Sequence, residues 1–308
     1  MVKQAKEIAQ KYVSAVTNII DQKTLETVAI YQDTDSCYVS FKLLNLNFSE
    51  AGKVTQETHD HVKALEDMLN VDIEKYAVAA FNSKDPRFVF KREAIADVGL
   101  FLEKKRYVLH VLDDEGIHCD KWKYTGVEVV RTSMPKVVKP HVKNIIETML
   151  STRSLAATNK ALTDTYDVFN KLPIEDISRT SGIKGYEKYA SLCNDFKIAK
   201  RTPNHVKAAY YHNLLIDKLG LDRKYTKISS GEKIKYFYVE KPNKYGIDCI
   251  GYKNKFPEEF KAIFSPDKEV LFEKIVYAAV EKFYEAVSWT PRKPSQQVQC
   301  ELFDIFGD

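Results

Sequence analysis

The sequence is poor in cysteine and glycine and has no long hydrophobic run, and each shortage argues against a class of protein. Its 308 residues include 5 cysteines, 11 glycines and 10 prolines. The cysteines are scattered, without a Cys-x-x-Cys pair, which argues against a disulfide framework or a zinc site and favours a reducing, cytoplasmic compartment. Apolar runs such as YAVAAF and IVYAAV are far shorter than the roughly 18 residues of a membrane span, so no membrane partner is expected.

Charge is abundant and unevenly distributed along the chain. Residues 21–85 carry twelve acids and six bases, whereas residues 121–143 carry six bases and one acid. Residues 196–216 add four further bases and no acid. Acidic and basic zones in one chain suggest a cation site beside a surface for a polyanion, while solvated faces are the simpler interpretation of any single zone.

The spacing of apolar residues predicts an α+β protein. Amphipathic helices are expected over residues 2–20, 53–69 and 72–81. Two β-rich runs predict a hairpin with strands from Val28 to Gln32 and from Cys37 to Phe41. Further strands are expected in RFVFKREAI, KKRYVLHVL, IHCDKWKY, KIKYFYVE and GIDCIGY, and a mostly helical stretch from Pro135 onward ends with a helix near 268–288. The pattern therefore places a small antiparallel unit before a mostly helical one.

Two acids, Asp33 and Asp35, stand at the tip of the expected hairpin, in the segment YQDTDS. Carboxylates at i and i+2 on a rigid turn suit Mg²⁺, which is a hard cation that prefers oxygen ligands. Phosphoryl transfer commonly uses two such ions, so a third carboxylate is expected elsewhere. An isolated Asp-x-Asp pair is weak evidence for a metal site by itself. It is also found in solvated turns and in enzymes that hold a nucleotide-sugar through a divalent metal.

YQDTDS resembles motif C of family B DNA polymerases, whose usual form is Tyr-Gly-Asp-Thr-Asp-Ser, with Gln32 here in place of the glycine. A glutamine is harmless there only if its φ is negative. Further segments resemble, in the family's order, the palm strand (KREAIA), the lysine-rich strand near the primer end (KKRY) and the palm-to-thumb crossing (GVEVVRTSMPKVVK) of the T-even-like phage branch. RTPNHVKAAYYHN, GEKIKYFYV and KYGIDCIGY resemble thumb segments, and ELFDIFGD is similar to a sliding-clamp tail.

The resemblance implies template-directed addition of deoxynucleoside triphosphates to primer-template DNA, with two Mg²⁺ ions and Mn²⁺ as a possible substitute. Asp35 matches the motif C metal ligand and Asp33 the neighbouring acid. Asp113 matches a palm acid, with the opening of the DDEG turn as the alternative, and Glu93 is a peripheral metal or structural acid, with an ion pair as the alternative. The implied DNA-binding residues are Lys104, Lys105, Arg106, Tyr107, Arg131, Ser133, Lys136 and Lys139.

The resemblance also divides the chain and indicates what it lacks. It implies the C-terminal part of a palm over residues 1–130, a thumb over 131–294, and a linker with a clamp-binding peptide over 295–308. The anchors of that peptide are Leu302, Phe303, Ile305 and Phe306. Motif A, the fingers helix and the 3′→5′ exonuclease have no counterpart in the sequence. We therefore expect an N-terminal polymerase chain as a partner and no activity of this chain alone. A non-catalytic module that binds duplex DNA and a clamp is the alternative.

Overall fold

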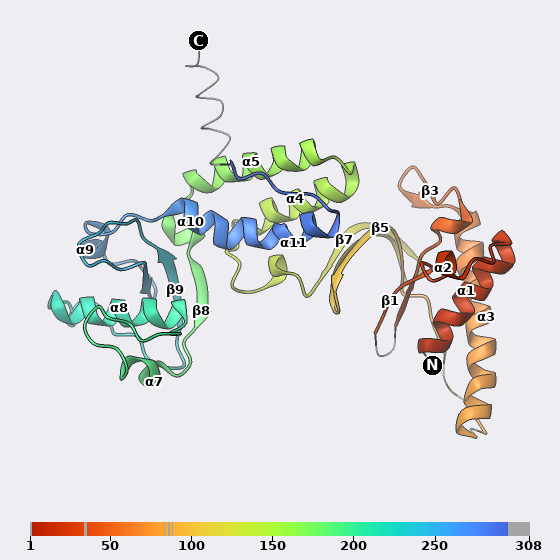
Figure 1. Cartoon of the computed structure of the whole chain (residues 1–308), viewed down its shortest axis with the longest axis horizontal. Helices are drawn as coiled ribbons and strands as arrows, with labels where there is room; N and C mark the ends of the chain where they lie inside the picture. The colour runs from red at the N-terminus through yellow and green to blue at the C-terminus, as the bar shows by residue number, and fades with distance from the viewer. Residues whose placement is uncertain (1, 34–35, 83, 86, 88, 295–308) are drawn as a thin grey trace, which may run out of the picture. The chain divides into compact units, whose positions relative to one another are not determined.

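The computed structural model of the chain describes residues 2–33, 36–82, 84–85, 87 and 89–294, and all statements below refer to these residues. They form two compact units, Met1–Gly126 and Val127–Asp308 (Figure 1). Both units contain helices and antiparallel sheets, which confirms the predicted α+β class. Within the described ranges, no helix is both long and apolar enough to cross a membrane.

The first unit is built on two helices, α1 (Val2–Thr17) and α3 (Gln56–Phe81), which pack against each other. Their shared core joins Ile8 and Val13 of α1 to Leu65 and Ile73 of α3. The predicted helices over 53–69 and 72–81 are in fact one helix, because no glycine or proline interrupts the stretch between them. Short elements connect the two helices: α2 (Gln22–Leu25), η1 (Lys42–Leu44), β3 (Ser49–Glu50) and β4 (Lys53–Val54).

Two antiparallel sheets complete the first unit. The predicted hairpin forms from β1 (Ala29–Gln32) and β2 (Cys37–Val39). The larger sheet has the order β5-β6-β7, with β5 (Ala94–Glu103), β6 (Arg106–Asp114) and β7 (Ile117–Thr125).

The predicted strand over RFVFKREAI begins only at Ala94. Part of the reason lies on α3, where the side-chain amide of Asn70 accepts from the Phe90 N–H at 2.7 Å and donates to its carbonyl at 2.9 Å. These bonds satisfy the Phe90 backbone in place of a neighbouring strand.

The second unit combines a helical layer with a three-stranded sheet. The helical layer pairs α4 (Lys139–Thr152) with α5 (Leu155–Lys171), and the segment α10 (Lys268–Phe272), η3 (Glu273–Tyr277) and α11 (Ala278–Ala286) packs on both. The sheet has the order β10-β9-β8, with α8 (Asn204–Lys218) against β9 and β10. Its strands are β8 (Arg179–Gly182), β9 (Lys233–Tyr238) and β10 (Cys249–Tyr252). The short helices are η2 (Glu128–Val130), α6 (Ile174–Ile177), α7 (Tyr186–Ala190) and α9 (Glu258–Lys261).

Candidate active site

The β1–β2 hairpin presents the acidic turn that the sequence singled out. Gln32 pairs with Cys37, and the Asp33 N–H donates to the Ser36 carbonyl at 3.0 Å, which closes a tight turn between the strands. Gln32 does not have a positive φ, so its side chain is tolerated where the family pattern has glycine. Asp35 lies outside the described residues. Of the two acids at the tip, Asp33 is therefore the one that the structure describes. Only 18% of its side chain is exposed.

The turn between β5 and β6 meets this tip. Glu103 pairs with Arg106, so Lys104 and Lys105 form a two-residue loop between the strands. The predicted strand over KKRYVLHVL therefore begins only at Arg106. Lys105 adopts a left-handed φ of 61°. Its backbone N–H donates to the Tyr31 hydroxyl at 2.7 Å, and its Nζ lies 3.7 Å from Asp33 Oδ2. A carboxylate and an ammonium group from distant segments are therefore brought together.

Tyr31 links the two turns directly. Its hydroxyl accepts from the Lys105 N–H and donates to Asp33 Oδ2 at 3.5 Å. The Lys105 side chain is 67% exposed, so solvent weakens its attraction to Asp33. The backbone bond from Lys105 to Tyr31 holds the turn in place.

Four aromatic rings behind the tip hold the two hairpins together. Tyr31 stacks on Phe101 with ring centroids 5.4 Å apart, and Tyr38 and Tyr107 each lie 5.2 Å from the Phe101 ring. Tyr38 and Tyr107 also share a hydrogen bond of 2.7 Å between their hydroxyls. Burial, and then this hydrogen bond, raise the pKa of Tyr38, so the Tyr38 hydroxyl stays uncharged. Tyr107 is buried, which makes it a support for the lysine turn.

Gly126, which sequence reasoning did not single out, packs against the same turn. Its φ is 63°, and a Cβ at this position would lie 2.1 Å from the Lys105 carbonyl oxygen. No side chain fits into that space. Tyr31, Tyr38 and Phe101 were likewise not selected from the sequence. Their only signal there was that aromatic residues flank the acidic and basic turns.

Asp113 and Glu93 lie at the other end of the β5–β6 hairpin. Asp113 is buried, and its Oδ1 accepts from Arg92 Nη1 at 2.7 Å and from the Gly116 N–H at 2.9 Å. The hydrogen bond from the Gly116 N–H to Asp113 is typical of an aspartate at the first position of a turn, here the DDEG turn. Arg92 therefore pairs with Asp113 rather than with its neighbour Glu93, which is exposed. Six residues along β6 separate Asp113 from Tyr107, roughly 20 Å in a strand.

The same sheet carries a charged triad centred on His110. Its Nδ1 lies 2.7 Å from Asp97 Oδ1, and its Nε2 lies 2.7 Å from Asp120 Oδ1. Burial lowers the pKa of His110, but hydrogen bonds to Asp120 and Asp97 outweigh it, so the pKa is raised. Protonated His110 therefore stabilises the fold.

This stabilisation is fully present below the ordinary histidine pKa of about 6.5 and is lost as the pH rises through the raised value. We expect the unsubstituted protein to have a higher free energy of unfolding than the His110→Gln variant. This difference should be larger in acidic than in alkaline buffer. Urea titrations of both proteins across this range measure the difference. A difference that does not change with pH would contradict the assignment.

The basic residues of the crossing segment belong to the second unit. Arg131 and Lys136 are exposed, and Ser133 and Lys139 are partly exposed. Arg131 pairs with Glu128 at 3.0 Å, and the Lys139 ammonium donates to the Val130 carbonyl at 3.4 Å. Lys139 begins α4, and Arg131 and Lys136 precede that helix in the sequence. The anchors Leu302, Phe303, Ile305 and Phe306 lie outside the described residues.

The donor chemistry of the tip fits a hard divalent cation. Asp33 offers carboxylate oxygens on a short, well-supported turn, and oxygen ligands are those that Mg²⁺ prefers. Within the part of the chain that the structure describes, no three histidine, cysteine or acidic residues gather into a complete metal site.

Comparison with known proteins assigns the chain to a family. The family model for DNA polymerase family B matches residues 1–287, which is nearly the whole chain. The chain belongs to DNA polymerase family B. This confirms the resemblance to family B DNA polymerases.

A curated relative is considerably longer than this chain. A DNA-directed DNA polymerase of Escherichia phage RB69 is 26% identical over 304 residues, which cover 91% of this chain and 32% of the relative. The chain thus spans about a third of the length of this relative.

Proposed function

We propose that this family B chain is the C-terminal portion of a DNA-directed DNA polymerase. Its first unit would be the C-terminal part of the palm and its second unit the thumb. The observation that supports this best is the meeting of two distant turns, with Asp33 3.7 Å from the Lys105 ammonium and both turns held by Tyr31. An anionic and a cationic turn side by side suit a reaction between a metal-bound triphosphate and a primer end.

In this proposal, Asp35 and Asp33 would hold divalent metal, together with a carboxylate of motif A from another chain. The bound ions would activate the attacking 3′-hydroxyl and stabilise the leaving pyrophosphate. Asp33 is kept in position by Tyr31 and by the backbone bond to Ser36. Such support limits the reorganisation needed at the moment of reaction, which is the main contribution a protein makes to this chemistry.

Lys104 and Lys105 would follow the minor groove of the primer-template duplex near the nascent base pair. Minor-groove acceptors are nearly the same for all base pairs, so a lysine can contact them without reading sequence. Arg106 and the buried Tyr107 would support the turn from the start of β6. Arg131, Ser133, Lys136 and Lys139 would contact phosphates, which position a duplex without specifying its sequence.

Duplex binding by the purified chain should depend steeply on salt. If about five cations contact phosphates, affinity should fall roughly 10² to 10³-fold between about 50 and 200 mM salt, because each contact releases counterions. Lys136→Ala should reduce the slope of log affinity against log salt by about one. Lys160→Ala, on an exposed lysine of α5 that pairs with Asp164, is the matched control and should leave the slope unchanged. Fluorescence anisotropy with a labelled primer-template measures both. A flat salt dependence would argue against a DNA surface.

Primer extension tests the catalytic proposal. The chain alone, supplied with Mg²⁺ and deoxynucleotides, should not extend a primer, because it carries neither motif A nor the fingers cations. Extension should appear when a chain carrying motif A, the fingers and the exonuclease is added. Robust extension by the single chain would contradict the need for a partner. Duplex binding without extension in the mixture would favour the alternative, a non-catalytic duplex- and clamp-binding module.

Residues 300–308 would bind a sliding clamp through Leu302, Phe303, Ile305 and Phe306. Four large apolar residues within five positions are typical of a peptide that inserts anchors into a groove. Deleting residues 300–308 should reduce processivity on clamp-loaded template and spare distributive synthesis. Equal loss of both would indicate a structural role for this segment instead.

A further inference from the structure

Tyr38, on β2, makes a hydroxyl contact that has no role in the polymerase chemistry proposed above. Its hydroxyl lies 2.7 Å from the Tyr107 hydroxyl, at the start of β6, although the two residues are 69 positions apart in the chain. Tyr107 is only 8% exposed, and its ring centroid lies 5.4 Å from that of Tyr38. The contact therefore joins the hairpin that carries Asp33 to the hairpin that carries the lysine turn, Lys104 and Lys105.

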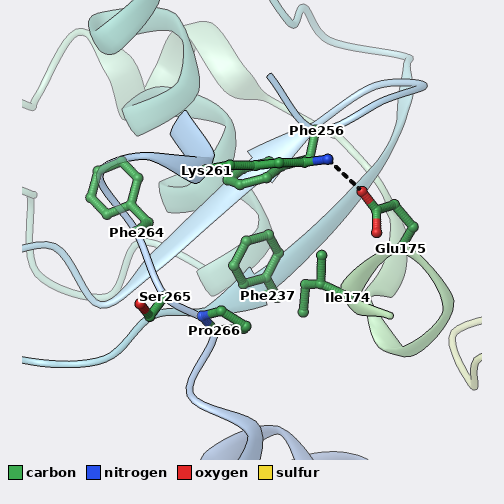
Figure 2. Close-up of a pocket in the computed structure, with 8 residues that line it drawn as sticks. All are labelled: Ile174, Glu175, Phe237, Phe256, Lys261, Phe264, Ser265 and Pro266. Atoms are coloured by element: carbon green, nitrogen blue, oxygen red, sulfur yellow. Dashed lines mark ion pairs between the residues drawn. The ribbon is translucent and has the colours of Figure 1, made fainter. Parts of the chain in front are cut away.

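Aromatic packing by itself does not require these hydroxyl groups. The second unit contains aromatic rings that pack without them, and Figure 2 shows three of these, Phe237, Phe256 and Phe264. They are at most 3% exposed, and the Phe237 and Phe256 centroids lie 4.9 Å apart. Between the two hairpins of the first unit, three of the four rings are instead tyrosines, and a buried hydroxyl is costly unless it is hydrogen-bonded. The hydroxyl pair thus adds a directional contact to the packing.

Tyr38 and Tyr31 attach the lysine turn at two separate points. The two tyrosines are paired across β1 and β2, with ring centroids 5.6 Å apart. The Tyr31 hydroxyl accepts from the Lys105 N–H at 2.7 Å, whereas the Tyr38 hydroxyl is bonded to that of Tyr107. Lys105 and Tyr107 are two residues apart, roughly 7 Å in an extended strand. One bond alone would let the turn rotate about it, but two bonds at different points fix both its position and its direction.

Tyr107 is also connected to the segment against which the turn packs. On β7, Thr125 pairs with Tyr107, and a Cβ on the next residue, Gly126, would lie 2.1 Å from the Lys105 carbonyl oxygen. A shift of Tyr107 would therefore reach Lys105 both along β6 and through Gly126. Because the packing is this close, a small displacement changes how the turn is presented.

We propose that Tyr38 is a positioning residue, whose hydroxyl holds that of Tyr107 and thereby fixes the lysine turn for contact with duplex DNA. Tyr107 then contributes to duplex binding through this bond and not by touching DNA, in contrast to the role that the family resemblance implied for it. This role rests on the proposed function, in which Lys104 and Lys105 follow the duplex. Tyr38 joins the residues on which that contact depends.

The duplex affinity of variants that lack a hydroxyl tests this role. Tyr38→Phe keeps the ring and removes the hydroxyl, so the lysine turn should spend less time in the binding arrangement. We measure the dissociation constant for a labelled primer-template by fluorescence anisotropy on the purified chain at constant salt. It should rise about five-fold, since affinity falls with the fraction of chains that are competent to bind.

Tyr12→Phe is the matched control. The Tyr12 hydroxyl lies 2.7 Å from His61 Nδ1 in the same unit, and Tyr12 is 9% exposed. Its loss should destabilise the unit to a similar extent in urea denaturation, yet leave the dissociation constant within about two-fold. A hydroxyl with a merely structural role would behave in the same way, so an equal rise of the constant in both variants would overturn the positioning role of Tyr38.

A double-mutant cycle separates positioning from direct contact. Tyr107→Phe alone should raise the dissociation constant about five-fold, and the variant with both substitutions should lie within about two-fold of either single variant, because both remove the same bond. If the Tyr107 hydroxyl touched DNA, the second substitution would weaken binding by a further factor, which would contradict the proposal. An unchanged constant in Tyr38→Phe would do the same. Absence of duplex binding by the unsubstituted chain would contradict the proposed function itself, and the positioning role with it.

Discussion

Replacing Asp35 by alanine should abolish synthesis by the complex of this chain with a partner that carries motif A. A metal ligand stabilises charge that develops in the transition state, so we expect primer extension to fall by about 10³-fold or more. Duplex affinity should change by less than about two-fold, because phosphate contacts rather than the hairpin tip dominate it.

The measurement combines single-turnover primer extension with anisotropy on the same duplex. Asp67→Ala is the matched control, since Asp67 is an exposed acid on α3 that pairs with Lys63. It should leave both extension and binding unchanged. Undiminished extension by Asp35→Ala would rule out the metal role of this turn and with it the catalytic proposal.

Replacing Gly126 by alanine should disrupt the lysine turn. The new methyl group would lie 2.1 Å from the Lys105 carbonyl, so the backbone of one segment must move. That movement would break the bond between the Lys105 N–H and the Tyr31 hydroxyl, which orients Asp33. We expect the free energy of unfolding to fall by about 3 kcal/mol or more, from overpacking together with an unfavourable φ. Duplex affinity and reconstituted extension should fall with it.

A second glycine separates the two causes. Gly220 has the same φ of 63°, but a Cβ there would meet nothing within 4 Å. Gly220→Ala should therefore lower the free energy of unfolding by about 1 kcal/mol, which is the cost of placing an alanine at a left-handed φ. Urea denaturation of both variants measures the contrast. Equal destabilisation would show that the contact between Gly126 and the lysine turn does not matter.

Much of the local structure could be predicted from the sequence, because it depends on short-range periodicity and turn chemistry. The hairpin around YQDTDS formed nearly where alternation placed it, and β7 follows IHCDKWKY. The misses have identifiable causes. α3 continues through a point where the apolar pattern weakens, and side-chain bonds from Asn70 remove part of an expected strand. β8, in the segment RTSG, has no apolar alternation and exists because β9 offers it a partner.

The candidate site divides in the same way. The sequence by itself determined that this chain carries an acidic turn, a basic turn and an apolar segment of polymerase type, since residue order and chemistry are enough to recognise them. Only the tertiary structure decided that Asp33 meets Lys105, that Tyr31 joins the two turns, and that Gly126 closes against them. The reason is physical. Contacts between residues 69 to 74 positions apart depend on how aromatic side chains such as Phe101 pack two hairpins together, and local periodicity does not encode that packing.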